Sequence, residues 1–503
     1  MSREEAHAKD ARGARDAKQN LNLRPWRGPF SPLATRHLLL LAILLLAFAL
    51  RVWQLTAVPP GLTHDEANHG REAIGILDGV LRYFFPLNYG SEPIYSYTVA
   101  LSMALLGRGL LALRLVNVVF GLLAIALTYA WGALWDARPA RLGRPAALLG
   151  AALLAVSFWP LASSREALRA GMLPFFMGLA VWAFWHILET AEGRPRAAAS
   201  SPWPAPRAPG RGRLLAAAGG RRSAVILFGL ALAATLHIYL AARVAWLLFP
   251  LFLGYLALAH RATFRRVWPP ALAGLLLGGL LSAPLFLYLR AHPEMQTRLD
   301  MLDGPLQAIA AGQWRPVLAN VTDALLAFVW PGRGDQFLAY NVPGRPVFDA
   351  VSAVFFVVGL GVCLWRWRRP AYAFLLLWFA VGIVPSLVTG PTANTTRNLA
   401  ALPAVFLLPA VGFAELGIRN YELGIGRKRL TQRFLREAPS PPLATLLAIL
   451  WLGYAAFVSG RDYFGRWANM PEVRGAYQAT LVAALDHVGR AYPDAEPVVF
   501  SSV

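Results

Sequence analysis

Charged residues and cysteine are both scarce in this sequence. Only 15% of its 503 residues are charged and 57% are hydrophobic, with a mean hydropathy of +0.46, whereas soluble domains average about 25% charged residues. This shortage excludes a large soluble core and predicts many helices buried in lipid. The single cysteine, Cys363, lies in an apolar run, so no internal disulfide can form and we interpret its thiol as a packing group.

Acidic residues are also few, 27 against 48 Lys and Arg, which gives a formal net charge of +21. A charge of this size favours nucleic-acid binding in a soluble protein. Here, however, the Arg residues cluster between apolar runs, which is typical of the loops of a membrane protein. We therefore expect membrane lipids, and no nucleic acid, among its partners.

Long apolar runs dominate the rest of the chain. An apolar stretch of about 20 residues crosses the hydrocarbon core as a helix. The candidate spans are 37–57, 111–135, 145–161, 171–189, 223–241, 244–260, 268–288, 349–365, 371–388, 399–417 and 442–460. A further run, 93–107, is shorter and carries several Tyr, Ser and Thr residues. The sequence predicts an all-α polytopic membrane protein with about 11 transmembrane helices.

The distribution of Lys and Arg decides whether 93–107 crosses the membrane, because basic loops favour the cytoplasmic side. If 93–107 does not cross and the N-terminus is cytoplasmic, every strongly basic short loop falls inside. If it crossed, those loops would face out while the basic N-terminal segment faced in. We therefore expect a juxtamembrane or re-entrant helix at 93–107, in an integral protein of the plasma (inner) membrane.

This topology divides the chain into three parts. Residues 1–36 are expected to be a disordered cytoplasmic tail, 37–460 the transmembrane domain, and 461–503 an extracytoplasmic tail that starts a small outer domain. The apolar end PVVFSSV indicates a strand without its partners. The loops of the transmembrane domain are predicted as outer 58–110, 162–170, 289–348 and 389–398, and as a Pro-, Ala- and Arg-rich inner linker 190–222.

Acidic residues mark successive outer boundaries of the predicted spans. Asp65 and Glu66 follow the first span, and Thr63 before them predicts a helix N-cap with Glu66 in the capping-box position. Glu92 and Glu166 follow at later outer boundaries. A well-capped surface helix would explain the first pair alone. Ionisable groups near membrane depth are costly, however, and their recurrence on one side indicates a functional site.

Basic and polar residues recur on the same side. The candidates are His237, Tyr239, Arg243, Arg298 and Arg397. Arg suits phosphate because its planar fork donates two hydrogen bonds, although interfacial Arg side chains also snorkel to the membrane surface without a ligand. An outer cleft with carboxylates and Arg side chains suits base activation of an acceptor and stabilisation of a phosphate leaving group.

A metal site is a second interpretation of these residues. His64, Asp65, Glu66, His69, Glu92 and His237 offer ligand atoms. The spacing HDEANH matches no specific metal motif. The sequence therefore predicts no certain cofactor and leaves a divalent metal open.

Several segments together resemble one known family. HDEANHGREA follows the first predicted span, EPIYSYTVALSMALLGRG begins the doubtful run, and SSREALRAGMLPFF fills the second outer loop. HIYLAARV, GDQFLAYNVPGRPVFD, TRNLAALPA and RDYFGRWA come later in the chain. In their order and topology these segments resemble the GT-C superfamily of membrane glycosyltransferases, in the branch with protein O-mannosyltransferases and the lipid A aminoarabinose transferase (glycosyltransferase family 39).

The resemblance implies a sugar donor on a polyprenyl phosphate, used on the outer face with inversion at the anomeric carbon. The acceptor would be a lipid, a glycan or a protein. The resemblance implies Asp65 as the base, Glu66 and Glu92 as residues that shape the acceptor and donor cleft, and Arg243, Arg298 and Arg397 at the phosphate. We group Glu66 with Asp65 as catalytic and expect Glu166 to bind substrate. The chain departs from the family in carrying Glu166 where many relatives have Asp, and in following Glu92 directly with Pro93.

Two other classes stay open from sequence. A membrane transporter or lipid flippase is the main alternative, but transporters place inverted repeats and charges at mid-membrane. A non-catalytic scaffold of the same fold is the other. The crowding of charge at the outer boundary favours the glycosyltransferase.

Overall fold

The predicted apolar runs all form helices in the computed structural model, which describes residues 32–137, 143–191, 210–296, 304–388, 394–427 and 443–491. The long helices are α2 (Pro32–Val52), α5 (Leu110–Ala133), α6 (Gly143–Val156), α8 (Leu173–Ala191), α9 (Gly210–Leu236), α11 (Leu248–Ala259), α12 (Arg261–Ala291), α16 (Ala350–Trp365), α17 (Pro370–Val388), α18 (Leu402–Arg427) and α19 (Leu443–Gly460). The described residues contain no β-strand, only an isolated bridge between Phe85 and Ser91.

Contacts divide the chain into two units, Met1–Ala42 and Ile43–Val503. The first unit is described only where α2 begins, and most of the predicted cytoplasmic tail lies outside the described residues. The middle of the predicted linker 190–222 and the predicted strand-like end at 497–503 also lie outside them. All further description concerns the second unit.

Within the described ranges, seven helices are long and apolar enough to cross a membrane, and eight if one bent pair is counted as a span. The bent pair corrects the prediction of a single span at 145–161. Here α6 ends at Val156 and α7 (Phe158–Arg165) starts after Ser157, at an angle of 56°. In a continuous helix the ring of Pro160 would clash with the carbonyl of Val156, so the chain breaks between them.

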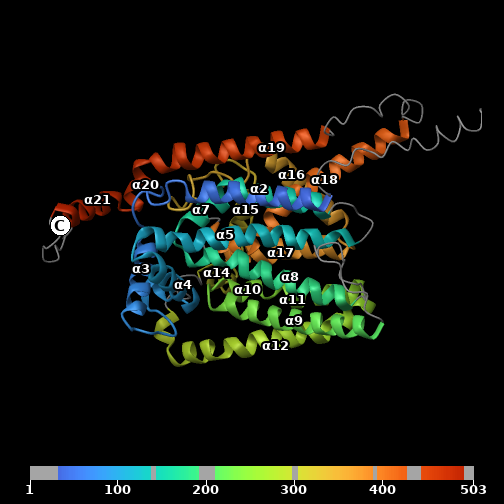
Figure 1. Ribbon diagram of the computed structural model, residues 1–503, viewed down its shortest axis with the longest axis horizontal. Coiled ribbons are helices and arrows are strands. Elements are labelled where there is room, and N and C mark those ends of the chain that lie inside the picture. The colour runs from blue at the N-terminus through green and yellow to red at the C-terminus, as the bar shows by residue number, and fades with distance from the viewer. Residues whose placement is uncertain are drawn as a thin grey trace, which may run out of the picture. The chain divides into compact units, whose positions relative to one another are not determined.

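The long helices of the second unit run side by side, and α3 (His64–Leu77) and α4 (Pro93–Leu106) lie together at one end of the bundle, here named the first-loop end (Figure 1). Helix α4 covers the doubtful run and does not cross. Arg108, just after α4, pairs with Asp78 at the end of α3 at 2.6 Å, and Glu92, just before α4, pairs with Arg169 in the turn η3 (Arg169–Met172). Both ends of α4 therefore stay at the first-loop end, as the charge distribution predicts.

Arg114 in α5 fixes the start of the first loop. Its guanidinium makes a bidentate ion pair with Glu66 at 2.8 and 2.9 Å. The same group donates to the backbone carbonyls of Leu55, Pro59 and Gly61 at 3.0, 2.9 and 2.6 Å. Both charged side chains are fully buried. One buried cation thus holds the segment that leads from α2 into α3.

Arg165, at the end of α7, holds the C-terminal end of α2 in a similar way. The last carbonyls of a helix lack intrahelical donors. Arg165 donates to four carbonyls at the end of α2 and beyond, those of Leu50, Arg51, Trp53 and Val58, at 2.7 to 2.8 Å. The bend before α7 therefore has a structural use, because it brings this guanidinium to the end of α2.

We expect Arg114→Met to destabilise the protein by about 3–5 kcal/mol, because it leaves the Glu66 carboxylate buried without its cation. Arg108→Met is the matched control, since it breaks an ion pair that is half exposed and such pairs contribute about 0–1 kcal/mol. Thermal unfolding of the detergent-solubilised protein measures both. Equal melting temperatures for the two variants would contradict the assignment.

Candidate active site

The start of α3 confirms the predicted capping box. The Glu66 amide donates to Thr63 Oγ1, and the Thr63 amide donates to Glu66 Oε2, both at 3.2 Å. The amide of Ala167, from the loop after α7, donates to Glu66 Oε1 at 2.9 Å. With the two bonds from Arg114, each oxygen of Glu66 accepts two hydrogen bonds from fixed donors. This carboxylate therefore joins α3, α5 and the loop after α7.

Asp65 lies next to Glu66 in the chain but in a different environment. Its side chain is half-buried, and within the described part of the chain it makes no hydrogen bond or ion pair. Its charge acts on the nearby carboxyl of Glu166. Of the two adjacent carboxylates, Asp65 is thus the one with capacity to accept a proton or a hydrogen bond from a substrate.

Glu166 closes this corner of the site. It follows α7, is 2% exposed, and accepts a hydrogen bond from Thr63 Oγ1 at 3.4 Å. Asn117 of α5 fixes its backbone by donating to the carbonyls of Glu166 and Leu168 at 2.6 and 2.7 Å. Burial raises the pKa of Glu166 well above its ordinary value, and the neighbouring charges of Glu66 and Asp65 raise it further. The protonated form is favoured.

A second charged group forms around Glu92, the residue before α4. Arg169 lies 3.3 Å from a Glu92 oxygen and donates to the Gly90 carbonyl at 2.6 Å. Its guanidinium lies 5.6 Å from the ring centroid of Tyr239. Arg243, in the short helix α10 (Ala242–Ala245), also interacts electrostatically with Glu92 and is half-buried. Two arginine side chains, Arg169 and Arg243, therefore interact with the Glu92 carboxylate, and the Tyr239 ring packs beside Arg169.

His237 borders this group on the α9 side. Its Nε2 lies 3.4 Å from the Tyr83 hydroxyl, its Nδ1 lies 2.9 Å from the Ala233 carbonyl, and its own carbonyl accepts from the Ile94 amide at 3.2 Å. His237 therefore links α9 to the start of α4.

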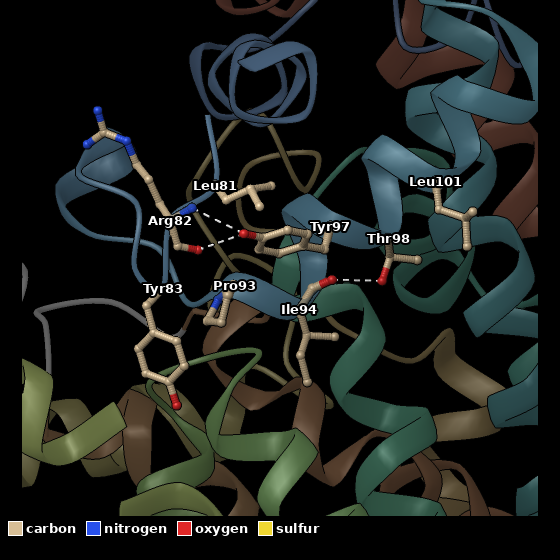
Figure 2. Close-up of a pocket in the computed structure, with 8 residues that line it drawn as sticks. All are labelled: Leu81, Arg82, Tyr83, Pro93, Ile94, Tyr97, Thr98 and Leu101. Carbon is tan, nitrogen blue, oxygen red and sulfur yellow. Dashed lines mark hydrogen bonds between the residues drawn. The ribbon is translucent and has the colours of Figure 1, made fainter. Parts of the chain in front are cut away.

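Beside this link lies a groove of about 690 Å³. Figure 2 shows its lining along α4, where Tyr97 bridges to the backbone of Arg82 and Thr98 bonds to Ile94. The lining residues are mostly apolar and come from the segment before the turn η1 (Leu87–Tyr89) and from one face of α4: Leu81, Arg82, Tyr83, Pro93, Ile94, Tyr97, Thr98 and Leu101. The groove is open and apolar, with Arg82 at its border.

Arg397 comes from a third part of the chain, the turn before α18. It lies in the turn η5 (Thr396–Ala401), which packs against η3, the turn that carries Arg169. Its side chain is half-buried. Arg298, the other predicted phosphate ligand of the long loop, lies outside the described residues.

A buried polar cluster lies between α3 and α4 and is not among the site residues predicted from the sequence. His69 shares a helix face with Asp65 by spacing, but its Nδ1 instead lies 3.0 Å from Glu72, which also accepts from Ser96 at 2.5 Å. The Tyr95 hydroxyl, buried beside them, has no hydrogen-bond partner in the described part of the chain. The i to i+3 spacing of His69 and Glu72 is the signal that would have found this pair.

The predicted metal ligands do not assemble. Within the described ranges no group of three or more His, Cys, Asp or Glu side chains is placed to hold a metal ion. His69 is engaged by Glu72, and His237 faces Tyr83. We therefore assign no step to a metal.

No protein-family model and no curated protein matches the sequence. Solved structures do match its fold. The oligosaccharyltransferase of Archaeoglobus fulgidus, tethered to an acceptor peptide, has a TM-score of 0.50 at 14% identity, over 86% of this chain and 55% of that chain. AglB of the same organism, with an inhibitory peptide and a dolichol-phosphate, has a TM-score of 0.51 at 15% identity, over 92% of this chain and 58% of that chain. ArnT from Cupriavidus metallidurans, bound to undecaprenyl phosphate, gives 0.49 at 14% identity, over 92% of this chain and 79% of that chain.

These oligosaccharyltransferases are GT-C superfamily membrane glycosyltransferases. The chain has the GT-C fold. It spans a little over half the length of the archaeal enzymes it matches. The GT-C resemblance expected from the sequence is confirmed in the fold, with α3 and α4 as the juxtamembrane helices of the first loop.

We expect Glu166→Gln to change how the stability of the protein depends on pH. Burial raises the pKa of Glu166, so the folded protein binds this proton more tightly than the unfolded chain does. The free energy of unfolding of the wild type should therefore fall as the pH rises from the ordinary range of Glu towards the raised pKa of Glu166. The Gln variant lacks this titration and should lose that part of the slope. Melting temperatures across this range measure the effect. Glu294→Gln, at an exposed side chain, should keep the wild-type slope, and a Glu166→Gln slope equal to wild type would contradict the prediction.

Proposed function

We propose that the protein is an inverting glycosyltransferase that moves a sugar from a polyprenyl-phosphate donor to an acceptor at the first-loop end of the bundle. The observation that carries this proposal is the contrast between two adjacent carboxylates. The Glu66 carboxylate accepts four hydrogen bonds from fixed groups, whereas the Asp65 carboxylate accepts none within the described residues. A general base needs such a free carboxylate on a rigid support.

In this mechanism Asp65 accepts the proton of the acceptor hydroxyl or amine while the acceptor atom attacks the anomeric carbon. The new bond forms on the face opposite the phosphate, the bond from carbon to phosphate oxygen breaks, and the polyprenyl phosphate leaves with the electron pair. The configuration at carbon is therefore inverted. Glu66 holds the N-terminus of α3 and so orients Asp65, while a protonated Glu166 keeps a further negative charge away from the base.

Arginine side chains are proposed to stabilise the leaving phosphate. Arg243 and Arg397 are half-buried, and they belong to elements that meet around Glu92 and Arg169. Glu92, with Tyr239 and His237 beside it, would orient Arg243 and Arg169 towards the donor. A preorganised cation in a partly desolvated site stabilises developing phosphate charge without reorganisation. Arg298 is proposed as a further phosphate ligand on the sequence resemblance alone.

The apolar groove along α4 is proposed to take the prenyl chain of the donor. Its lining is mostly hydrophobic, and it lies beside His237 and the start of α4, close to the Glu92 group. Support for a lipid phosphate comes from AglB, whose structure holds a dolichol-phosphate. A chain bound in an open groove at the edge of the bundle can enter laterally from the bilayer.

The acceptor is proposed to be a lipid, a glycan or a protein of the cell envelope. The site is proposed to face the outside of the plasma (inner) membrane, with the N-terminus in the cytoplasm. The basic turn at Arg366–Arg369, between α16 and α17, supports this orientation, because the two helices bring it to the end of the bundle opposite the first loop.

Asp65→Asn should abolish sugar transfer while leaving folding intact, because Asn keeps the size of the side chain but cannot accept the proton. The expected loss is on the order of 10²–10⁴-fold in kcat, the usual contribution of a positioned base. Transfer of a labelled sugar by the purified protein, together with its melting temperature, measures this. Asp78→Asn, at an exposed carboxylate at the other end of the same helix, is the control. A fully active Asp65→Asn protein would disprove the assignment of the base.

Thr98→Trp should fill the groove along α4 and raise KM for donors with a long prenyl chain, with little change in kcat. Leu105→Trp is the control, since Leu105 lies on the same helix, is 74% exposed and does not line the groove. Initial rates with long-chain and short-chain donors measure the difference. If Thr98→Trp impairs both donors equally, the prenyl chain does not bind there.

A further inference from the structure

Three segments far apart in the sequence meet at the first-loop end. They are the loop 331–349 before α16, the turn η5 at the start of α18, and the chain after α19. Arg345 of the first segment pairs with Asp462 of the last at 2.8 Å. The carbonyls of Leu338 and Ala339 accept from Trp467 and Tyr477 at 2.8 and 3.0 Å. The loop 331–349 is therefore fixed from outside itself.

Within this loop Asp335 is held in one position. Its carbonyl accepts from Asn341 Nδ2 at 3.0 Å and from the Gly344 amide at 3.2 Å. Asn341 also donates to the Arg345 carbonyl at 2.8 Å, next to the ion pair with Asp462. The backbone of Asp335 thus has little freedom.

The side chain of Asp335 reaches the start of η5. Oδ2 accepts from the Thr395 amide at 2.8 Å and from Thr395 Oγ1 at 2.7 Å, while Oδ1 accepts from the Phe337 amide at 2.8 Å. Asp335 is 1% exposed. Both oxygens therefore face backbone N–H groups. An Asn side chain would place its own NH2 group against one of these donors, so only a carboxylate satisfies the site.

Arg397 follows two residues after Thr395, in the same turn. Its positive charge also interacts favourably with the Asp335 carboxylate. The opposite side of the turn is held by Ser386 of α17, whose hydroxyl oxygen lies within hydrogen-bond distance of the Asn394 carbonyl and of Asn398 Oδ1, at 2.8 and 2.7 Å. The turn that carries Arg397 is thus held by Asp335 on one side and by Ser386 on the other, and of these two side chains Asp335 is the charged one.

We infer that Asp335 is a positioning residue that orients Arg397 towards the phosphate of a polyprenyl-phosphate ligand. The inference rests on the proposed function and adds to it a residue outside the donor site. Asp335 is not proposed to contact the substrate. It acts through Thr395, whose hydroxyl and amide it fixes, and through its charge on Arg397.

Asp335→Asn should weaken binding of a polyprenyl phosphate without a sugar by about tenfold, the scale of one charge-assisted hydrogen bond. Binding to the purified full-length protein in detergent measures this directly. A second pair of variants guards against misfolding. Thr395→Val removes the hydroxyl bond to Asp335 and should weaken binding of the polyprenyl phosphate. Thr395→Ser keeps this bond and should bind the polyprenyl phosphate like wild type. Unchanged affinity in both Asp335→Asn and Thr395→Val would overturn the inference.

A double-mutant cycle separates positioning from general damage. If Asp335 acts through Arg397, the protein with Asp335→Asn and Arg397→Met should bind no more weakly than Arg397→Met alone. Full additivity of the two losses would overturn the inference. Asp78→Asn, at an exposed carboxylate outside the proposed site, should bind the polyprenyl phosphate like wild type. If wild type itself does not bind, the proposed function and this inference both fail; if it binds and the Asp335 variants match it, only the inference fails.

Discussion

The buried ion pair between Arg114 and Glu66 is the contact on which the first-loop end depends. Burying two charges is expensive, and the cost is offset only when geometry and further hydrogen bonds satisfy both groups. Here Arg114 also holds three carbonyls before α3, and Glu66 also holds the amides of Thr63 and Ala167. A single pair therefore ties together the exit from α2, the start of α3, the helix α5 and the second loop.

The ion pair also gives the two neighbouring acidic residues, Asp65 and Glu66, different environments. A helix start places Asp65 and Glu66 about 100° apart around the axis, so one can point into the protein while the other faces its edge. Because the inward position is filled by Glu66, the Asp65 carboxylate stands on a rigid helix start and has no hydrogen-bond partner in the described part of the chain. The same contrast appears at Glu92, which is buried against Arg169, while Arg243 beside it stays half-buried. In both places a buried charged residue in an ion pair lies beside a half-buried one and fixes the backbone or surroundings of that residue.

The sequence predicted local features well and long-range pairings poorly. Apolar runs, charge distribution and the capping box depend on neighbours within a few residues, and the helices, the non-crossing α4 and the Thr63 cap all follow them. Glu66 meets Arg114 across 48 residues and Ala167 across 101, and nothing in a single sequence specifies such partners. The role of Arg114 was missed for the same reason, because it depends on how separate helices pack. The break at Ser157 has a local cause in Pro160, which the apolar character of the run concealed.

The three late segments show how topology converts sequence order into a site. Because α16 to α19 alternate in direction, the loop before α16, the turn before α18 and the chain after α19 all fall at the first-loop end. Each is fixed by buried polar contacts between segments, since water near the bilayer is a poor competitor for such bonds when they are enclosed. A cation such as Arg397 on a turn braced in this way loses little side-chain freedom when an anion binds. Such preorganisation favours recognition of a phosphate over simple accumulation of positive charge.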